Sequence, residues 1–224
     1  MKHCYPLAAT LFLALAANVA SAAIIASSGA ATPIAPPADV TLNALESDTL
    51  APVFVERTDF TLPVDLQVHI TLPGTSPTAV DMNFSPGAIP AGTRIDSYYV
   101  HFDSLGDSTT TEAVVVDGSI TFDRDVLGLI VGPILLNESN LLVGAPGTLY
   151  PSDPSLEIVA GGAGLEANDL LTLSSDRRTV TFNFRNTAHL DSFRIITEVP
   201  EPGSCVLLAS GLGLLAAMRW RRRR

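Results

Sequence analysis

The stretch RIDSYYVHF, Arg94–Phe102, alternates between two kinds of side chain. In an extended strand, successive side chains point to opposite faces. One face therefore carries Tyr98, Val100 and Phe102, and the other carries Ser97, Tyr99 and His101. A period of two predicts a β-strand here, and the frequency with which the pattern recurs decides the fold of the middle of the chain.

The same period recurs in VDLQVHI (Val64–Ile70), RTVTFNFR (Arg178–Arg185) and SFRIIT (Ser192–Thr197). Shorter apolar runs predict further strands at Val53–Arg57, Ala113–Val116, Ser119–Phe122, Val126–Val131, Leu156–Val159 and Leu170–Leu173. Asp117-Gly118 is typical of a two-residue hairpin turn, and Ser139–Val143, with Ser139 as its N-cap, is the one short helix expected. Many short strands with almost no helical period predict an all-β fold, an antiparallel β-sandwich of jelly-roll type.

Composition divides the chain into four parts. Residues 1–22 read as a signal peptide, because Lys2 precedes an apolar run and Ala20 and Ala22 give the small-x-small pattern of a signal-peptidase site. Residues 23–49, rich in Ala, Ser and Pro, are expected to be a loose lead-in segment. Residues 50–198 hold the predicted β-sandwich ectodomain, and residues 199–224 form a C-terminal tail.

Charge and cysteine content narrow the function of the middle part. The formal net charge is −10, and between Ala23 and Val199 there are 22 acidic residues against 7 basic ones. Such a surface repels nucleic acid, which we therefore exclude as a partner. The two cysteines, Cys4 and Cys205, lie in the apolar ends, so the middle has no disulfide, thiolate metal site or cysteine nucleophile.

The tail joins a short motif, an apolar run and a basic end. Pro200, Glu201 and Pro202 precede Ser204–Met218, in which no residue is charged. A helix of that length rises roughly 22 Å, a little less than an ideal membrane span. The basic end consists of Arg219, Arg221, Arg222, Arg223 and Arg224. It should stay on the cytoplasmic side, so we expect a transmembrane helix with the ectodomain outside the inner membrane.

This order of motif, apolar helix and arginine-rich end resembles the PEP-CTERM sorting signal of bacteria that make extracellular polysaccharide. The resemblance implies that an exosortase, a membrane protease, recognises the tail and removes it, which delivers the protein to the cell surface or matrix. TLPGTS, SYYVHFD, GSITFDRDVLGLI, RRTVTF and DSFRIIT also resemble a β-rich ectodomain that recurs in PEP-CTERM proteins. That second resemblance implies no mechanism.

Acidic residues suggest one cofactor, calcium. Asp103, Asp107, Asp123 and Asp125 supply hard oxygen ligands, and the last two share a face if their strand continues. The spacing lacks the pattern of an EF-hand loop, and Asp commonly occupies turns. The alternatives are therefore a structural calcium site between neighbouring strands and no cofactor at all.

Sugar binding is the second candidate, because the resemblance points to extracellular polysaccharide as a partner. If both tyrosines of SYYVHF lie on one strand, either Tyr98 or Tyr99 faces outward. An exposed Tyr99 with His101 would make a modest platform for a sugar ring. The alternative is an ordinary cross-strand aromatic pair.

Enzyme signatures are scarce, and we name no catalytic residue. GxSxG and HExxH are absent, and no pair of carboxylates stands out as the converging pair of a glycosidase. We expect an exported, non-enzymatic surface or matrix-associated protein, cut by signal peptidase and exosortase and transiently anchored in the membrane. The alternative is a secreted carbohydrate-active enzyme that uses acidic residues.

Overall fold

The computed structural model describes residues 23–77, 87–106, 113–151, 165, 169–186 and 190–199, all within one compact unit, Ala20–Pro200. The strands are β1 (Ile24–Gly29), β2 (Ala31–Ile34), β3 (Ala51–Thr61), β4 (Leu66–Val68), β5 (Gly74–Pro77), β6 (Gly87–Ile89), β7 (Arg94–Phe102), β8 (Val114–Phe122), β9 (Val126–Ile130), β10 (Leu170–Leu173), β11 (Thr179–Asn186) and β12 (Asp191–Glu198). One helix, α1 (Pro133–Val143), is described. The fold is all-β.

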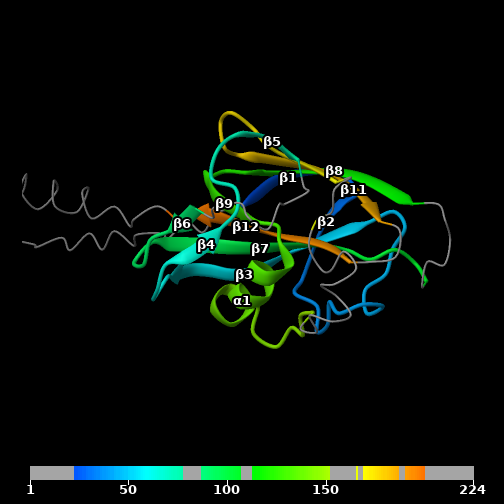
Figure 1. Cartoon of the computed structure of the whole chain (residues 1–224), viewed down its shortest axis with the longest axis horizontal. Helices are drawn as coiled ribbons and strands as arrows, with labels where there is room; N and C mark the ends of the chain where they lie inside the picture. Colours follow the sequence, from blue (N-terminus) through cyan, green and yellow to red (C-terminus); the bar gives the residue numbers. More distant parts are fainter. Residues whose placement is uncertain are drawn as a thin grey trace, which may run out of the picture. The chain divides into compact units, whose positions relative to one another are not determined.

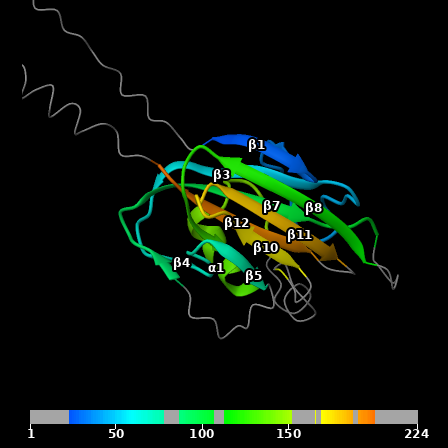
Figure 2. The ribbon, with the colours of Figure 1, turned by 90° about the horizontal axis from the view of Figure 1, so that it is seen from above.

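Two five-stranded sheets form the body of the molecule (Figure 1). The first has the order β1-β8-β11-β10-β5, and these strands lie side by side in Figure 2. The second has the order β2-β3-β7-β12-β9, and a separate two-stranded sheet pairs β4 with β6. The chain crosses between the two large sheets at β1 to β2, β7 to β8, β8 to β9, β9 to β10 and β11 to β12.

The inner faces of the two sheets meet in an apolar core. Phe182 and Phe184 of β11 stack with ring centroids 4.6 Å apart, and both contact the ring of Phe193 on β12. Phe102 of β7 stacks on Phe184 with centroids 5.8 Å apart. The period of two therefore sends the aromatic side chains of both sheets into one core, which makes the molecule a β-sandwich.

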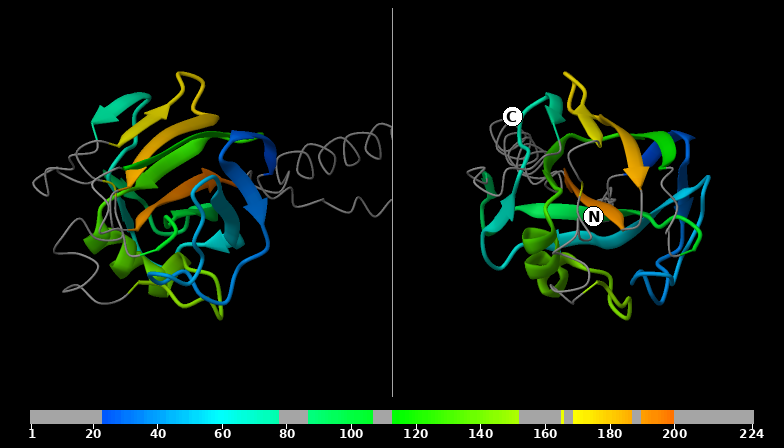
Figure 3. Two further views of the ribbon diagram at one scale, coloured as in Figure 1. Left: turned by 90° about the vertical axis from the view of Figure 1, so that its right-hand side faces the viewer. Right: turned by 45° about the vertical axis from the view of Figure 1, so that its right-hand side comes forward.

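The second sheet is covered on its outer face as well. Helix α1 packs there (Figure 3), and Leu136 and Val143 of the helix join Phe54, Tyr99 and Ile196 of the sheet in a second apolar cluster. Strand β7 is consequently buried on both faces along almost its whole length. Its alternation separates two apolar environments instead of separating core from solvent.

Three local predictions are wrong. Residues 23–49 are not a loose lead-in segment throughout, because β1 pairs with β8 and β2 pairs with β3. The β2–β3 pair is parallel, so the sandwich is not purely antiparallel. Asp117-Gly118 is not a turn but lies within β8, where a Cβ on Gly118 would come 2.2 Å from the ring of Phe182. The glycine is there because an aromatic ring from the opposite strand occupies its place.

Other predictions fare differently. The expected strand Leu170–Leu173 coincides with β10, whereas the helix begins six residues earlier than expected, at Pro133, so Ser139 is not its N-cap. None of the described helices is both long and apolar enough to cross a bilayer. The signal peptide, the predicted transmembrane helix and the strand at 156–159 lie outside the described residues, and the jelly-roll assignment stays a prediction.

Candidate functional site

The predicted sugar platform is not accessible. Tyr99 is 1% exposed and His101 is 0% exposed, because the second apolar cluster and the segment around Leu45 cover that face of β7. The ring of Tyr99 instead packs against Phe54 and Tyr150, with centroids 5.5 and 5.2 Å away. The prediction that Tyr99 and His101 form an exposed platform is therefore wrong, and its alternative, a packed aromatic pair, describes Tyr99.

Asp103 lies far from the other described members of the predicted calcium site, Asp123 and Asp125. Asp103 follows the end of β7 that pairs with Asp191, whereas Asp125 lies beside Glu198, at the other end of the same strand pair. Seven residues of strand separate these ends, roughly 23 Å. The structure thus does not assemble the predicted site from the members it describes, and Asp107 lies outside the described residues.

Each described acid of that set has a local partner instead. The Asp103 carboxylate accepts the backbone N–H of Asn43 at 2.7 Å, and the Asp123 carboxylate accepts that of Ala23 at 2.9 Å. Asp125 forms a surface ion pair with Arg178 at 3.4 Å. Across the part of the chain that the structure describes, no three His, Cys, Asp or Glu side chains gather as metal ligands would.

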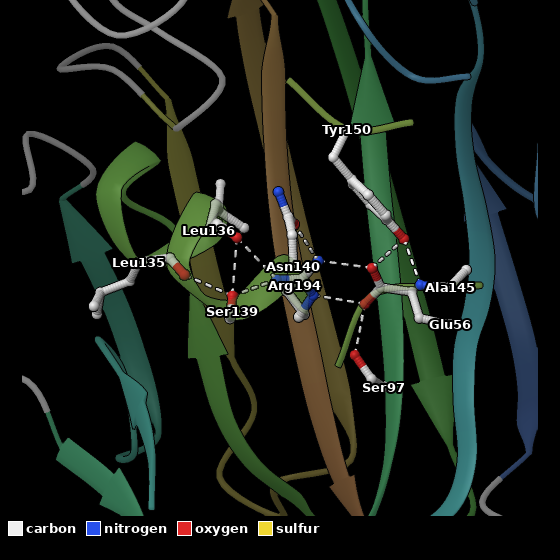
Figure 4. Close-up of polar contacts among 9 residues, drawn as sticks. All are labelled: Glu56, Ser97, Leu135, Leu136, Ser139, Asn140, Ala145, Tyr150 and Arg194. Atoms are coloured by element: carbon white, nitrogen blue, oxygen red, sulfur yellow. Dashed lines mark hydrogen bonds and ion pairs between the residues drawn. The ribbon is translucent and has the colours of Figure 1, made fainter. Parts of the chain in front are cut away.

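A buried ion pair on the outer side of the second sheet is the centre of a cluster of polar side chains (Figure 4). Arg194 of β12 donates from Nε to Oε2 of Glu56 on β3 at 2.6 Å, and from Nη2 to Oε1 at 2.7 Å. Both side chains are 0% exposed. Ser97 and Tyr150 each donate a hydroxyl hydrogen to the same carboxylate at 2.6 Å, so both of its oxygens are fully engaged.

The other side of Arg194 holds helix α1. The guanidinium donates to Ser139 Oγ, to Asn140 Oδ1 at 2.9 Å and to the Leu136 carbonyl at 3.2 Å. The Ser139 hydroxyl in turn donates a shared hydrogen bond to the Leu135 and Leu136 carbonyls, 2.5 and 3.0 Å away. One guanidinium therefore ties the helix to β3.

The neighbouring carboxylate keeps the Arg194 guanidinium charged. Burial works against the guanidinium, but the adjacent Glu56 carboxylate raises the pKa of Arg194 above its ordinary value. Burial, followed by the Glu56 charge, raises the pKa of Tyr150, so its hydroxyl stays a donor. Since a buried and fully hydrogen-bonded pair offers no accessible acid, base or nucleophile, we assign the cluster to structure.

The outer face of the first sheet has a different character. Strand register places one hydroxyl side chain on each of its five strands in a single line, which we call the hydroxyl row: Ser28, Ser119, Thr181, Thr172 and Thr75. Strands lie about 4.8 Å apart, so the row runs across the strands for roughly 19 Å. Ser28 and Ser119 share a hydrogen bond of 2.8 Å, and Thr75 and Thr172 share one of 2.9 Å.

A shallow hollow of about 420 Å³ opens over this row. It is lined by Ser28, Ser119, Thr172 and Thr181 together with Gly29, Asp117, Gly118, Leu170, Phe182 and Asn183. Asp117 is the one ionisable side chain among these described lining residues, and it accepts a hydrogen bond from Asn183. Leu170 adds an exposed apolar side chain. The hollow is thus an almost uncharged surface in which hydroxyl and amide groups lie among apolar ones.

The sequence analysis missed both features. Each strand of the first sheet contributes only one member to the hydroxyl row, so no single stretch reveals it before the register is known. Arg194 alternates with Phe193 and Ile195, which suggests a solvent-facing position. Ile196, apolar on the same face as Arg194, was the available signal that this face is also buried.

The last strand ends where the predicted tail begins. Val199 donates its N–H to the Arg94 carbonyl at 3.1 Å, and Glu198 donates to the Asp125 carbonyl at 3.0 Å. Val199 is 5% exposed. The sorting-motif residues Pro200, Glu201 and Pro202, the arginine end, and Ala20 and Ala22 all lie outside the described residues.

Comparison with known proteins bears on this tail. A family model for the PEP-CTERM protein-sorting motif matches residues 198–224. The search of curated proteins and the search of solved structures found no match. The resemblance of the tail is therefore confirmed, and it implies export, transient membrane anchoring and an exosortase as the processing partner.

Proposed function

We propose that this chain with a PEP-CTERM sorting motif is a cell-surface or extracellular protein whose β-sandwich has a non-enzymatic role in an exopolysaccharide matrix. Signal peptidase removes residues 1–22 on export, the tail holds the protein in the inner membrane, and an exosortase then releases it from that anchor. The observation that carries the proposal is the match of the sorting motif to residues 198–224, directly behind the closing strand of the fold.

Two features of the ectodomain support a structural or binding role. The buried cluster around Arg194 and Glu56 ties helix and sheet together and leaves none of its own groups accessible for reaction. The hollow over the hydroxyl row holds one carboxylate among its described lining residues, whereas hydrolysis of a glycosidic bond needs two that converge. These features favour binding over the alternative of a carbohydrate-active enzyme.

Cell fractionation tests the proposal. We expect the protein in the surface or extracellular fraction of cells with active exosortase, and in the inner-membrane fraction of cells that lack it. Replacing Pro200-Glu201-Pro202 by three alanines should produce the same retention in normal cells. An unchanged distribution in all three strains would contradict the proposal.

A further inference from the structure

We propose that the hydroxyl row is a binding site for an uncharged polysaccharide that lies across the strands of the first sheet. This inference deepens the proposed function, on whose matrix role it rests, by naming a surface and the chemical class of its ligand. It starts from the register, which lines up one hydroxyl from each of five strands. Figure 2 shows these strands side by side.

The chemistry of the row matches a polyhydroxylated chain. A Ser or Thr hydroxyl offers one hydrogen and two acceptor lone pairs. Two hydroxyls that share one hydrogen bond, as Ser28 and Ser119 do, retain one further hydrogen and three lone pairs between them. The hydroxyls along the row can therefore both donate hydrogen bonds to successive sugar hydroxyls and accept hydrogen bonds from them.

The charge of the surface selects against ionic polymers. The segment Ala23–Val199 carries 22 acidic and 7 basic residues, so a polyanion such as an alginate is repelled. The single ionisable residue of the described lining, Asp117, already accepts a hydrogen bond from Asn183, which gives a polycation little to bind. An uncharged glycan suffers neither penalty.

Shape and apolar contacts fit the same ligand. The hollow is open and is lined by the row members of four strands, β1, β8, β11 and β10, a span of roughly 14 Å that is long enough for more than one sugar unit. Leu170 borders the row and is 51% exposed, so it offers an apolar contact for the C–H face of a sugar ring. Thr121 and Thr179, whose hydroxyls share a hydrogen bond of 3.0 Å, extend the hydroxyl surface on the side of the row away from Leu170.

The test uses the full-length protein extracted in detergent and sedimented with insoluble polymers. Three neutral probes are amorphous cellulose, cross-linked dextran and cross-linked galactomannan; alginate and chitosan beads are the charged probes. We expect saturable binding to at least one neutral probe, unchanged by added salt because no ionic contact is involved, and little binding to alginate. Any binding to chitosan should disappear at high salt, because it would depend on the net negative charge of the protein. Binding to none of the neutral probes would overturn the proposal.

Variants locate the site. Thr172→Val with Thr181→Val keeps the β-branched shape and removes two hydroxyls, which should weaken binding about tenfold. Thr172→Ser with Thr181→Ser keeps both hydroxyls and should retain binding. Thr61→Val, an exposed strand position of the other large sheet, is the matched control and should bind normally. Equal binding by the Val pair and the unmodified protein would overturn the assignment.

A measurement on the unmodified protein covers the case in which the Val pair does not fold. A soluble oligosaccharide of the bound polymer should shift the NMR signals of the Thr172 and Thr181 methyl groups and leave that of Thr61 unchanged; the reverse pattern would overturn the site.

Sorting is a separate question. Binding by the purified protein is independent of exosortase, so failed fractionation with intact binding contradicts the sorting proposal alone.

Discussion

At the residue scale, the stability of the sandwich depends on Arg194. Replacing it with Met would leave the Glu56 carboxylate buried without its countercharge, which typically costs about 3–5 kcal/mol. We expect Arg194→Met to lower the free energy of unfolding in urea by that order. Arg178→Met is the matched control, because the Arg178–Asp125 pair is exposed and contributes at most about 1 kcal/mol. Equal stability of the two variants would contradict the structural role of the cluster.

His101 makes stability depend on pH. Burial lowers its pKa from 6.5 to about 4, so the folded chain stays unprotonated at this position while the unfolded chain binds a proton near pH 6.5. The contribution of the neutral His101 to the free energy of unfolding is therefore fully present above pH 6.5 and is lost as the pH falls toward 4. Between pH 7.5 and pH 5 the loss is about 2 kcal/mol.

Urea unfolding at the two pH values isolates this contribution. His101→Gln should unfold with a smaller pH dependence than the unmodified protein. His69, whose pKa burial also lowers, serves as the comparison: His69→Gln should keep the part that His101 supplies. If His101→Gln retains the full pH dependence, the buried neutral histidine is not its source.

At the scale of elements, the sequence predicts strands better than it predicts what covers them. Alternation identifies β7, β11 and β12, because a period of two in the side chains can be recognised from the sequence. It cannot show that α1 covers the outer face of β7, since that burial depends on a helix far along the chain. For the same reason an exposed platform at Tyr99 was a reasonable but wrong expectation.

Asp117-Gly118 shows a second limit at this scale. A glycine that permits a turn and a glycine that makes room for a ring are identical in sequence. The Phe182 ring from the neighbouring strand decides between them, and that contact exists only in the assembled sheet.

At the scale of the whole molecule, the hydroxyl row exists only because five strands from distant parts of the chain share one register. The tail, in contrast, was recognisable from sequence alone, because its motif, apolar run and arginines are contiguous. Contiguous sequence motifs therefore predict export and membrane anchoring, whereas the candidate binding surface becomes visible only in the assembled sandwich.

The junction between sandwich and tail makes the sorting claim testable by one measurement, the intact mass of the protein from cells with and without active exosortase. Strand β12 lies between β7 and β9 in its sheet, and Val199 directly after it is hydrogen-bonded, so cleavage must fall beyond Val199 to leave the fold whole. We predict a C-terminus in or near Pro200-Glu201-Pro202 with exosortase, and a retained tail ending in Arg224 without it. The same mass in both strains, or a C-terminus upstream of Val199, would contradict the account.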